Sequence, residues 1–375
     1  MKKIMVKLLG KEKLQMFRIS LFAILISFIV GALILFLIGK NPFLAYANFF
    51  QGSGLLPKGN YAGRQNMFTD FMSFLDALTP MIFASLSVAV AMKCGLFNIC
   101  VSGMMLAAGF SASVIIGMSD MPAPVAKPLV IIIGIVAGGV IGMFIGWLKY
   151  RFNINEVVSS IMLNYILMYI ITFFINTFFV DPTSRQSKLI SDASRLTLVG
   201  IKTETLKMDI PLAFPLAIIT ALFIKFLMDR TTMGYEIKAV GMSRRAAEYA
   251  GISVRSSIIK TMMISGALAG LAGVSYFCGY TGSIQPGVVP SMGFNAIAVA
   301  LLGNTDAIGC VFASFLITVI SKGSIYLSSR QGVDIEIADL ITAVILIFAA
   351  CGEFIRRYVA KASAEIEQAK KESAA

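Results

Sequence analysis

Polar and aromatic residues interrupt the long apolar runs of this sequence. Their side chains are the first candidates for a chemical role. Gly95, Phe97 and Asn98 lie between two apolar runs with Leu96 after the glycine. Gly293, Phe294 and Asn295 repeat the order later in the chain without the leucine, and we call both stretches Gly-Phe-Asn motifs. Polar or aromatic groups beside a helix break can meet a base or a ribose. We therefore expect these residues to line a polar pathway.

A second polar group follows a regular spacing. Glu156, Ser160 and Asn164 stand at i, i+4 and i+8, so they share one face of a helix. Asn155 is a suitable N-cap, and Glu156 suits the positive N-terminal end of that helix. Asn164 lies about two turns deeper, where an amide is costly to expose to lipid. Pathway lining and helix–helix hydrogen bonding remain equally open for Asn164.

A charged insert between two apolar runs extends from Asp229 to Lys260. Ser243 can cap a short helix there, and Gly251 can adopt the left-handed conformation that ends it. The helix between them is small and charged at its edges, and its residues are Arg244, Arg245, Ala246, Ala247, Glu248 and Tyr249. We expect it to dock into another protein through its alanine face. The alternative is a loop helix that lies on lipid headgroups.

The composition is that of a membrane protein. Hydrophobic residues make up 57% of the chain and charged residues 14%, and the mean hydropathy is +0.83. A soluble chain of this length could not bury that much apolar surface, whereas a bilayer can. The net charge of +12 would suggest nucleic acid in a soluble protein. Here the basic residues concentrate in the predicted cytoplasmic segments, which explains the charge by the membrane topology. No nucleic-acid partner is therefore expected.

Ten apolar segments of suitable length predict an all-α polytopic membrane protein with both termini in the cytoplasm. The predicted parts are a cytoplasmic leader (1–16), a transmembrane domain (17–354) and a cytoplasmic tail (355–375). The ten segments are 17–38, 75–93, 99–118, 128–148, 157–179, 210–228, 257–279, 293–303, 309–328 and 337–354. The leader resembles the start of a signal peptide, but its apolar run is too long, so we expect an uncleaved first span.

Two stretches, 75–179 and 257–354, repeat an order of glycine-rich spans, polar turns and Gly-Phe-Asn breaks. Because they start five spans apart, the second copy is inverted in the membrane, as in many transporters. The short apolar run 293–303 rises only about 16 Å, against roughly 30 Å of hydrocarbon, so its backbone must be completed by irregular chain. Gly134, Gly138, Gly142 and Gly146 predict a close-packing face.

Several kinds of chemistry are excluded or disfavoured. The chain has no histidine, which removes the commonest general base and metal ligand. Its cysteines show no metal-like or disulfide-like spacing, so no metal site is expected. The sequence lacks a GxxxxGK[ST] phosphate loop, so it does not bind ATP by that route. No Asp or Glu falls clearly in the middle of a predicted span, which disfavours a proton-driven carrier.

Three motifs resemble those of a known family. GYEIKAVG at 234–241 with AAEYAGI at 246–252 is similar to the coupling loop of bacterial ABC importer permeases, in the branch of simple-sugar, branched-chain amino acid and nucleoside systems. NEVVSSIMLNYI at 155–166 and the two Gly-Phe-Asn motifs resemble nucleoside and simple-sugar members. Relatives commonly have Gly-x-Glu-Gly-Gln after the first motif. This chain has Ser102 and Met104 there, which places any polar role of Ser102 and the substrate class in doubt.

The resemblance implies a permease subunit in a bacterial plasma membrane, with residues 229–256 as the coupling loop. Its implied partners are a second permease (a related but different chain), a cytoplasmic ATPase that holds ATP and Mg, a lipid-anchored binding protein and membrane lipid. The chain itself would be no enzyme and would bind no cofactor. The expected substrate is a nucleoside. The alternatives are a simple sugar such as a pentose, or an ion-coupled carrier that acts alone.

Overall fold

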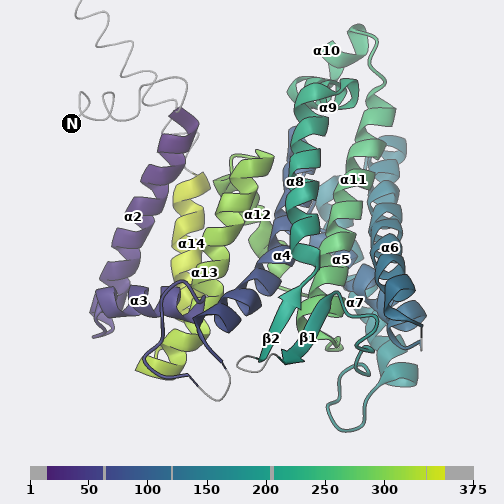
Figure 1. Cartoon of the computed structure of the whole chain (residues 1–375). Helices are drawn as coiled ribbons and strands as arrows, with labels where there is room; N and C mark the ends of the chain where they lie inside the picture. The colour runs from purple at the N-terminus through teal and green to yellow at the C-terminus, as the bar shows by residue number, and fades with distance from the viewer. Residues whose placement is uncertain (1–14, 62–64, 120, 203–206, 335, 351–375) are drawn as a thin grey trace, which may run out of the picture. The chain divides into compact units, whose positions relative to one another are not determined.

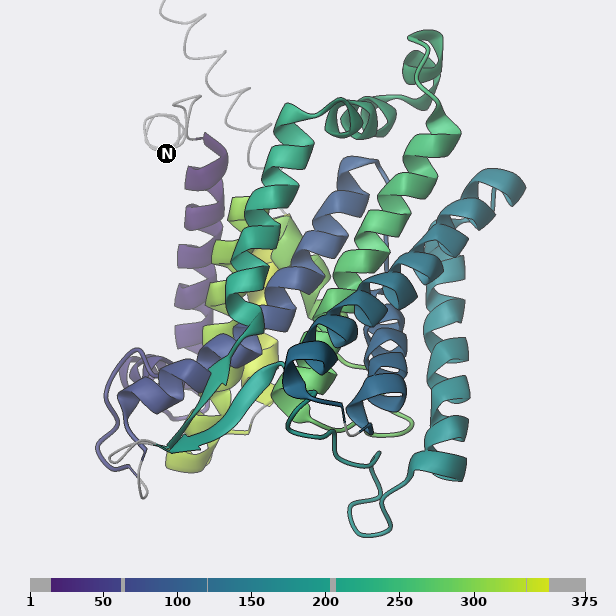
Figure 2. The same ribbon diagram turned by 45° about the vertical axis from the view of Figure 1, so that its right-hand side comes forward.

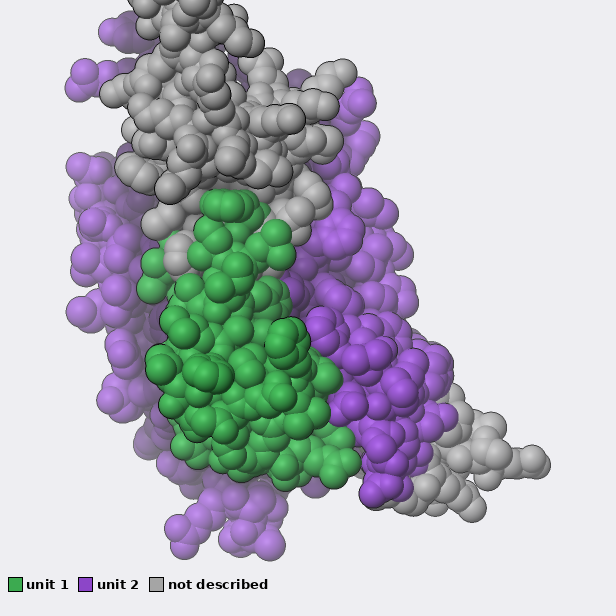
Figure 3. Space-filling model, turned by 90° about the vertical axis from the view of Figure 1, so that its left-hand side faces the viewer, with its two compact units in different colours: residues 1–49, 323–375 green, residues 50–322 purple. Residues whose placement is uncertain are grey.

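The computed structural model describes residues 15–61, 65–119, 121–202, 207–334 and 336–350. The chain divides into two compact units, residues 1–49 with 323–375, and residues 50–322 (Figure 3). Every candidate site residue with a described position belongs to the second unit.

The first unit joins the beginning and the end of the chain. Its helices are α2 (Gln15–Leu37), most of α3 (Pro42–Gly52), the last turns of α13 (Ala307–Gln331) and α14 (Glu336–Ala350). α2 packs against α14, and Gly31 of α2 leaves room for α3, because a Cβ there would lie 2.9 Å from the Tyr46 hydroxyl oxygen. The Tyr46 hydroxyl donates a hydrogen bond to the Phe28 carbonyl at 2.5 Å, which fixes α3 on α2.

The second unit is a helical bundle with one small sheet (Figures 1 and 2). Its helices in chain order are α4 (Met67–Lys93), α5 (Val101–Ala112), η2 (Ser113–Gly117), α6 (Ala123–Phe152), α7 (Glu156–Phe174), η3 (Ile175–Phe179), α8 (Ala213–Arg230), α9 (Thr232–Met242), α10 (Arg244–Tyr249), α11 (Val254–Ser275), η4 (Tyr276–Thr281), α12 (Met292–Leu302) and the start of α13. The three η segments are single turns of π-helix that extend α5, α7 and α11.

α4 is the central helix of this unit. It begins earlier than the sequence predicted, at Met67 rather than residue 75, because Asn66 and Thr69 form a reciprocal capping box. From residue 77 to residue 91 every residue of α4 is buried. Pro80 lies inside the helix and removes the backbone donor that the Asp76 carbonyl would otherwise receive. The course of α4 changes direction along its length (Figure 2).

The predicted glycine face is confirmed. A Cβ on Gly138 would lie 2.1 Å from the Gly266 carbonyl oxygen, and one on Gly142 would lie 2.1 Å from that of Met262. α6 and α11 therefore meet backbone against backbone, which only glycine allows at these positions. Their contact is the most extensive between any two helices.

A two-stranded antiparallel sheet interrupts the helices, which corrects the prediction of an all-α fold. β1 (Thr197–Lys202) pairs with β2 (Lys207–Pro211) in the register Thr197 with Pro211, and the ladder contains an irregularity after Leu198. The hairpin lies at the end of the second unit opposite α9 and α10 (Figures 1 and 2). The hairpin falls between the predicted spans 157–179 and 210–228 and takes up the first two residues of the second one.

The described residues form a polytopic membrane protein. Five helices are long and apolar enough to cross a bilayer, and a sixth candidate is the pair Leu25–Leu37 and Pro42–Gly52, which is bent by 114°. Each of the ten predicted segments is helical over most of its described length, although residues 210–211 belong to β2 and α5 begins only at Val101. The count of ten crossings and the inverted repeat stay predictions.

Candidate functional site

Asn98 is held in a network of buried hydroxyl groups. Its side chain is fully buried and donates to Ser265 Oγ on α11 at 2.8 Å, while its carboxamide oxygen accepts from the Cys100 N–H at 3.0 Å. Ser265 Oγ in turn donates to the Ser87 carbonyl on α4 at 2.8 Å. Asn98 therefore fixes the chain between α4 and α5, and in this conformation it faces no open space.

Asn164 makes the helix–helix contact that the sequence left open. Its carboxamide oxygen accepts from the Gly103 N–H at 2.7 Å, and its Nδ2 donates to the Ile99 carbonyl at 3.0 Å. The first turn of α5 has backbone N–H groups without a partner in its own helix, and Asn164 on α7 satisfies one of them. The side chain is 3% exposed.

Ser102 connects α5 with the segment that precedes α12. Its hydroxyl donates to the Pro290 carbonyl at 2.8 Å and is fully buried. Gly293 lies directly against it, because a Cβ on Gly293 would fall 2.2 Å from Ser102 Oγ. The start of α5, which follows the first motif, thus packs against the start of the second motif.

The two motifs differ in local structure. The first is extended chain before α5, with Gly95 in the left-handed region at φ +68°, whereas the second forms the first turns of α12. Phe97 and Asn295 are half-buried, and Phe294 is 46% exposed. Of the six predicted pathway residues, these three are the ones with accessible side chains.

The predicted docking helix is present with the predicted caps. The Ser243 hydroxyl accepts from the Ala246 N–H at 3.3 Å, and Gly251 has φ +81°. One part of the prediction is wrong, because Ala247 points into its own chain and is 4% exposed. The outward residues are the ones that can contact another protein, and they are Met242, Arg244, Arg245, Ala246, Glu248 and Tyr249. Met242 and Tyr249 are 89% and 94% exposed.

The docking element touches the first Gly-Phe-Asn motif through its backbone. Gly241, the penultimate residue of α9, lies so close to the end of α4 that a Cβ would fall 2.1 Å from the Lys93 carbonyl oxygen. Gly95 lies over the Gly241 carbonyl in the same contact. Movement of α9 and α10 would therefore be transmitted to the chain that holds Phe97 and Asn98.

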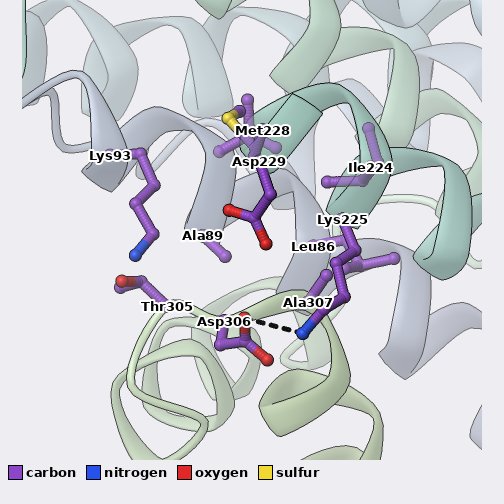
Figure 4. Close-up of a pocket in the computed structure, with 11 residues that line it drawn as sticks. Leu86, Ala89, Lys93, Ile224, Lys225, Met228, Asp229, Thr305, Asp306 and Ala307 are labelled. Atoms are coloured by element: carbon purple, nitrogen blue, oxygen red, sulfur yellow. Dashed lines mark ion pairs between the residues drawn. The ribbon is translucent and has the colours of Figure 1, made fainter. Parts of the chain in front are cut away.

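A small cavity of about 30 Å³ lies beside this contact, between α4, α8 and the turn before α13 (Figure 4). That volume holds about one or two water molecules. Its lining includes Lys93, Lys225, Asp229, Thr305 and Asp306. Lys225 pairs with Asp306 at 3.6 Å, and each side chain is at least a third exposed, so the pair contributes at most about 1 kcal/mol.

The turn beside the cavity has an unusual backbone. Asn304 and Thr305 both have φ +54°, a left-handed conformation that is rare for a β-branched residue such as Thr305. Asp306 Oδ2 accepts from the N–H groups of Ile308 and Gly309 and so caps α13. The turn is thereby fixed between α12 and α13.

Asp76 is a polar residue that sequence reasoning missed. It was placed at the edge of a span, but it lies in the third turn of α4 and is 8% exposed. Thr197 Oγ1 on β1 donates to Asp76 Oδ1 at 2.7 Å. Lys322 and Arg195 attract the carboxylate, and Asp209 opposes it. Asp76 together with Pro80 four residues later was a signal that could have drawn attention to this part of α4.

The described residues contain no group of three or more Cys, Asp or Glu that could hold a metal ion. Cys94, Cys100, Cys278 and Cys310 are free and buried.

Comparison with known proteins identifies the family of this chain. Residues 71–350 match the family described as branched-chain amino acid transport system / permease component. The chain belongs to this family. No solved structure matches this permease.

Relatives of the permease cover nearly its whole length. It is 36% identical to the nucleoside ABC transporter permease NupB of Lactococcus lactis, over 92% of this chain and 94% of NupB. It is 33% identical to the guanosine ABC transporter permease NupP of Bacillus subtilis, over 93% of this chain and 97% of NupP. The glucose ABC transporter permease TsgB13 of Haloferax volcanii is 27% identical over 74% of this chain and 75% of TsgB13.

Proposed function

We propose that this chain is the permease subunit of an ATP-driven importer of nucleosides in a bacterial plasma membrane. The observation that supports the proposal is its similarity to a nucleoside permease and a guanosine permease over more than nine tenths of each chain. The glucose permease is less similar and aligns over a smaller share of the chain. The relatives therefore favour a nucleoside over a simple sugar.

In this proposal the chain carries no ATPase of its own. ATP and Mg are held by a separate cytoplasmic ATPase, a second permease completes the pathway, and a lipid-anchored external protein delivers the substrate. α10 docks into the ATPase, and the Gly241 contact transmits its motion to the start of α5. Phe97, Phe294 and Asn295 face the substrate, whereas Asn98, Ser102 and Asn164 hold the pathway in shape.

The proposed orientation places the leader, the α9–α10 element and the tail in the cytoplasm, because Lys and Arg concentrate there. The β1–β2 hairpin then lies outside. Single cysteines at Ser191 and Ser243 test this directly in intact cells. An impermeant thiol reagent should label the first from outside and spare the second.

The function is tested by uptake into proteoliposomes that contain the full transporter, with guanosine as substrate and with other nucleosides, nucleobases, ribose, glucose and amino acids as competitors. Nucleosides should compete and sugars should not. Competition by ribose alone would favour a sugar importer. An ATPase variant that cannot hydrolyse ATP is the matched control, and uptake that persists with it would favour an ion-coupled carrier.

A further inference from the structure

The position of Asp76 on α4 calls for a functional explanation. A carboxylate within a membrane-spanning helix carries a high desolvation cost, and such residues are usually retained for a role in the transport cycle. Asp76 is buried among apolar neighbours from Phe74 to Leu78. Its hydrogen bond to Thr197 reaches across 121 residues of sequence and ties a transmembrane helix to the β1–β2 hairpin.

The backbone of α4 is weakened at the same place. Pro80 has no N–H, so the Asp76 carbonyl lacks its helical partner four residues later. A helix can bend at such a position because no backbone hydrogen bond opposes the opening. The segment of α4 before Pro80 can therefore change its angle relative to the buried segment after it. The side chain of Asp76 lies on this movable segment.

The partner of Asp76 is held firmly in place. The Leu196 N–H donates to the Cys278 carbonyl at 2.8 Å, and Arg195 Nη2 donates to the Gly279 carbonyl at 3.1 Å. Both bonds anchor the start of β1 on η4. Gly279 leaves room for the contact, since a Cβ there would lie 3.3 Å from Thr197 Oγ1. Lys322 on α13 donates to the Tyr280 hydroxyl at 3.0 Å on the same turn of η4.

We propose that the hydrogen bond between Asp76 and Thr197 is the latch of the outer gate, and that it must break for α4 to bend at Pro80 and admit substrate. The latch joins one movable element, the first turns of α4, to one fixed element, the hairpin on η4. The charged groups that act on the Asp76 carboxylate are the cations Lys322 and Arg195 and the anion Asp209. The inference rests on the proposed transport function, because an outer gate has meaning only in a transporter.

The first test uses a thiol on the movable segment of α4 as the reporter of gate opening. Ala77 lies next to Asp76 and is 7% exposed. In an Ala77→Cys variant that is otherwise wild type, the modification of this cysteine by an impermeant methanethiosulfonate added outside intact cells is quantified by mass spectrometry of its peptide. Thr197→Val removes the donor and should raise the labelling rate about fivefold, the factor that corresponds to one hydrogen bond of about 1 kcal/mol. Thr79→Val is the matched control, because Thr79 bonds only to the Leu75 carbonyl of its own helix.

Labelling needs neither substrate nor nucleotide, so it can succeed even if the nucleoside assignment fails. Equal labelling rates in the Ala77→Cys variant with and without Thr197→Val would overturn the latch. Asp76→Asn keeps an acceptor for Thr197 and should raise the rate less than Asp76→Leu, whereas a purely structural role would give both variants the same low expression and the same labelling.

A second test closes the latch covalently. Asp76→Cys combined with Thr197→Cys is treated with a short bifunctional methanethiosulfonate in the complete transporter. Bridging should stop the uptake measured in the same double variant before treatment, and reduction should restore it, while the wild-type transporter treated in the same way controls for effects of the reagent. Full transport by the bridged form, or failure of the pair to bridge, contradicts the proposal.

Discussion

The Asn164 carboxamide on α7 binds both ends of one short backbone segment, the Ile99 carbonyl and the Gly103 N–H on α5. A single side chain thus completes the hydrogen bonding of the broken start of a membrane helix. Asn164 therefore belongs to the residues that shape the pathway and not to those that face it. The first prediction follows from this.

Asn164→Leu should destabilise the permease. It leaves a buried donor and a buried acceptor without partners, at about 1–3 kcal/mol each. The melting temperature of the purified transporter should fall by several degrees, and uptake should fall in proportion to the folded protein. Tyr165→Leu is the control, since that side chain is 54% exposed. Lost uptake at an unchanged melting temperature would instead make Asn164 a substrate contact.

The effect of an alanine substitution on the glycine face should depend on how closely the added methyl group approaches the facing helix. Gly142→Ala places a methyl group 2.1 Å from the Met262 carbonyl, whereas Gly139→Ala meets nothing closer than 3.7 Å. The first variant should lose about 1–3 kcal/mol of stability through overpacking, and the second should be nearly neutral. Thermal unfolding of both variants in the same detergent measures the difference. Equal stabilities would mean that α6 and α11 are less closely packed in the membrane.

The docking helix should bind its ATPase through an exposed aromatic anchor. Tyr249→Ala removes a side chain that is 94% exposed, so the permease itself should fold normally. Aromatic anchors at the centre of an interface contribute about 2 kcal/mol or more, equivalent to roughly a thirtyfold weaker association. Pull-down of the ATPase by the purified permease measures this. Leu189→Ala, on an exposed residue of segment 180–210, is the control. Unchanged association in Tyr249→Ala would place the ATPase contact elsewhere.

Gly241→Ala should uncouple the two proteins without separating them. The added methyl group would meet the Lys93 carbonyl and push α9 away from the start of α5. ATPase association should remain near wild type, because Gly241 lies on the inner side of the element. Uptake per ATP hydrolysed should fall. Wild-type transport by this variant would show that motion reaches the pathway by another route.

Removal of Lys225 and removal of Asp306, the ion pair beside the small cavity, should destabilise the permease to different extents. Lys225→Ala loses only a partly exposed ion pair and should cost less than about 1 kcal/mol. Asp306→Ala also loses the cap of α13, at about 0.5–2 kcal/mol. Chemical unfolding of both variants compares them, and a larger loss from Lys225→Ala would contradict the capping role.

Local signals predicted much of the fold. The caps at Ser243 and Asn155 and the glycine spacing on α6 depend on neighbouring residues in the sequence, and all three are confirmed. Contacts between residues far apart in the chain could not be predicted from the sequence. Nothing near Asn98 indicates Ser265 as its partner, 167 residues away. Asp76 was missed because the capping box at Asn66 extends α4 outward, which turns an expected span end into a helix interior.

The side of the helix on which Ala247 lies could not be predicted from the sequence either. A six-residue helix exposes most of its surface, so its spacing does not say which side meets the chain's own backbone. The packing of α10 on α9 and α11 decides it. The alanine face therefore supports the helix from within, and the large side chains at its edge remain for a partner.

The backbone contact between α6 and α11 restricts which parts of the permease can move. Gly138 and Gly142 of α6 and Gly266 and Gly270 of α11 each lie directly against a carbonyl oxygen of the other helix. Sliding or rotation of either helix would therefore force these oxygens into the neighbouring backbone. The pair must travel as a single rigid frame throughout any transport cycle. Alternating access then has to come from elements that pack on this frame through softer contacts, so a cross-link between α6 and α11 should leave the transport rate unchanged.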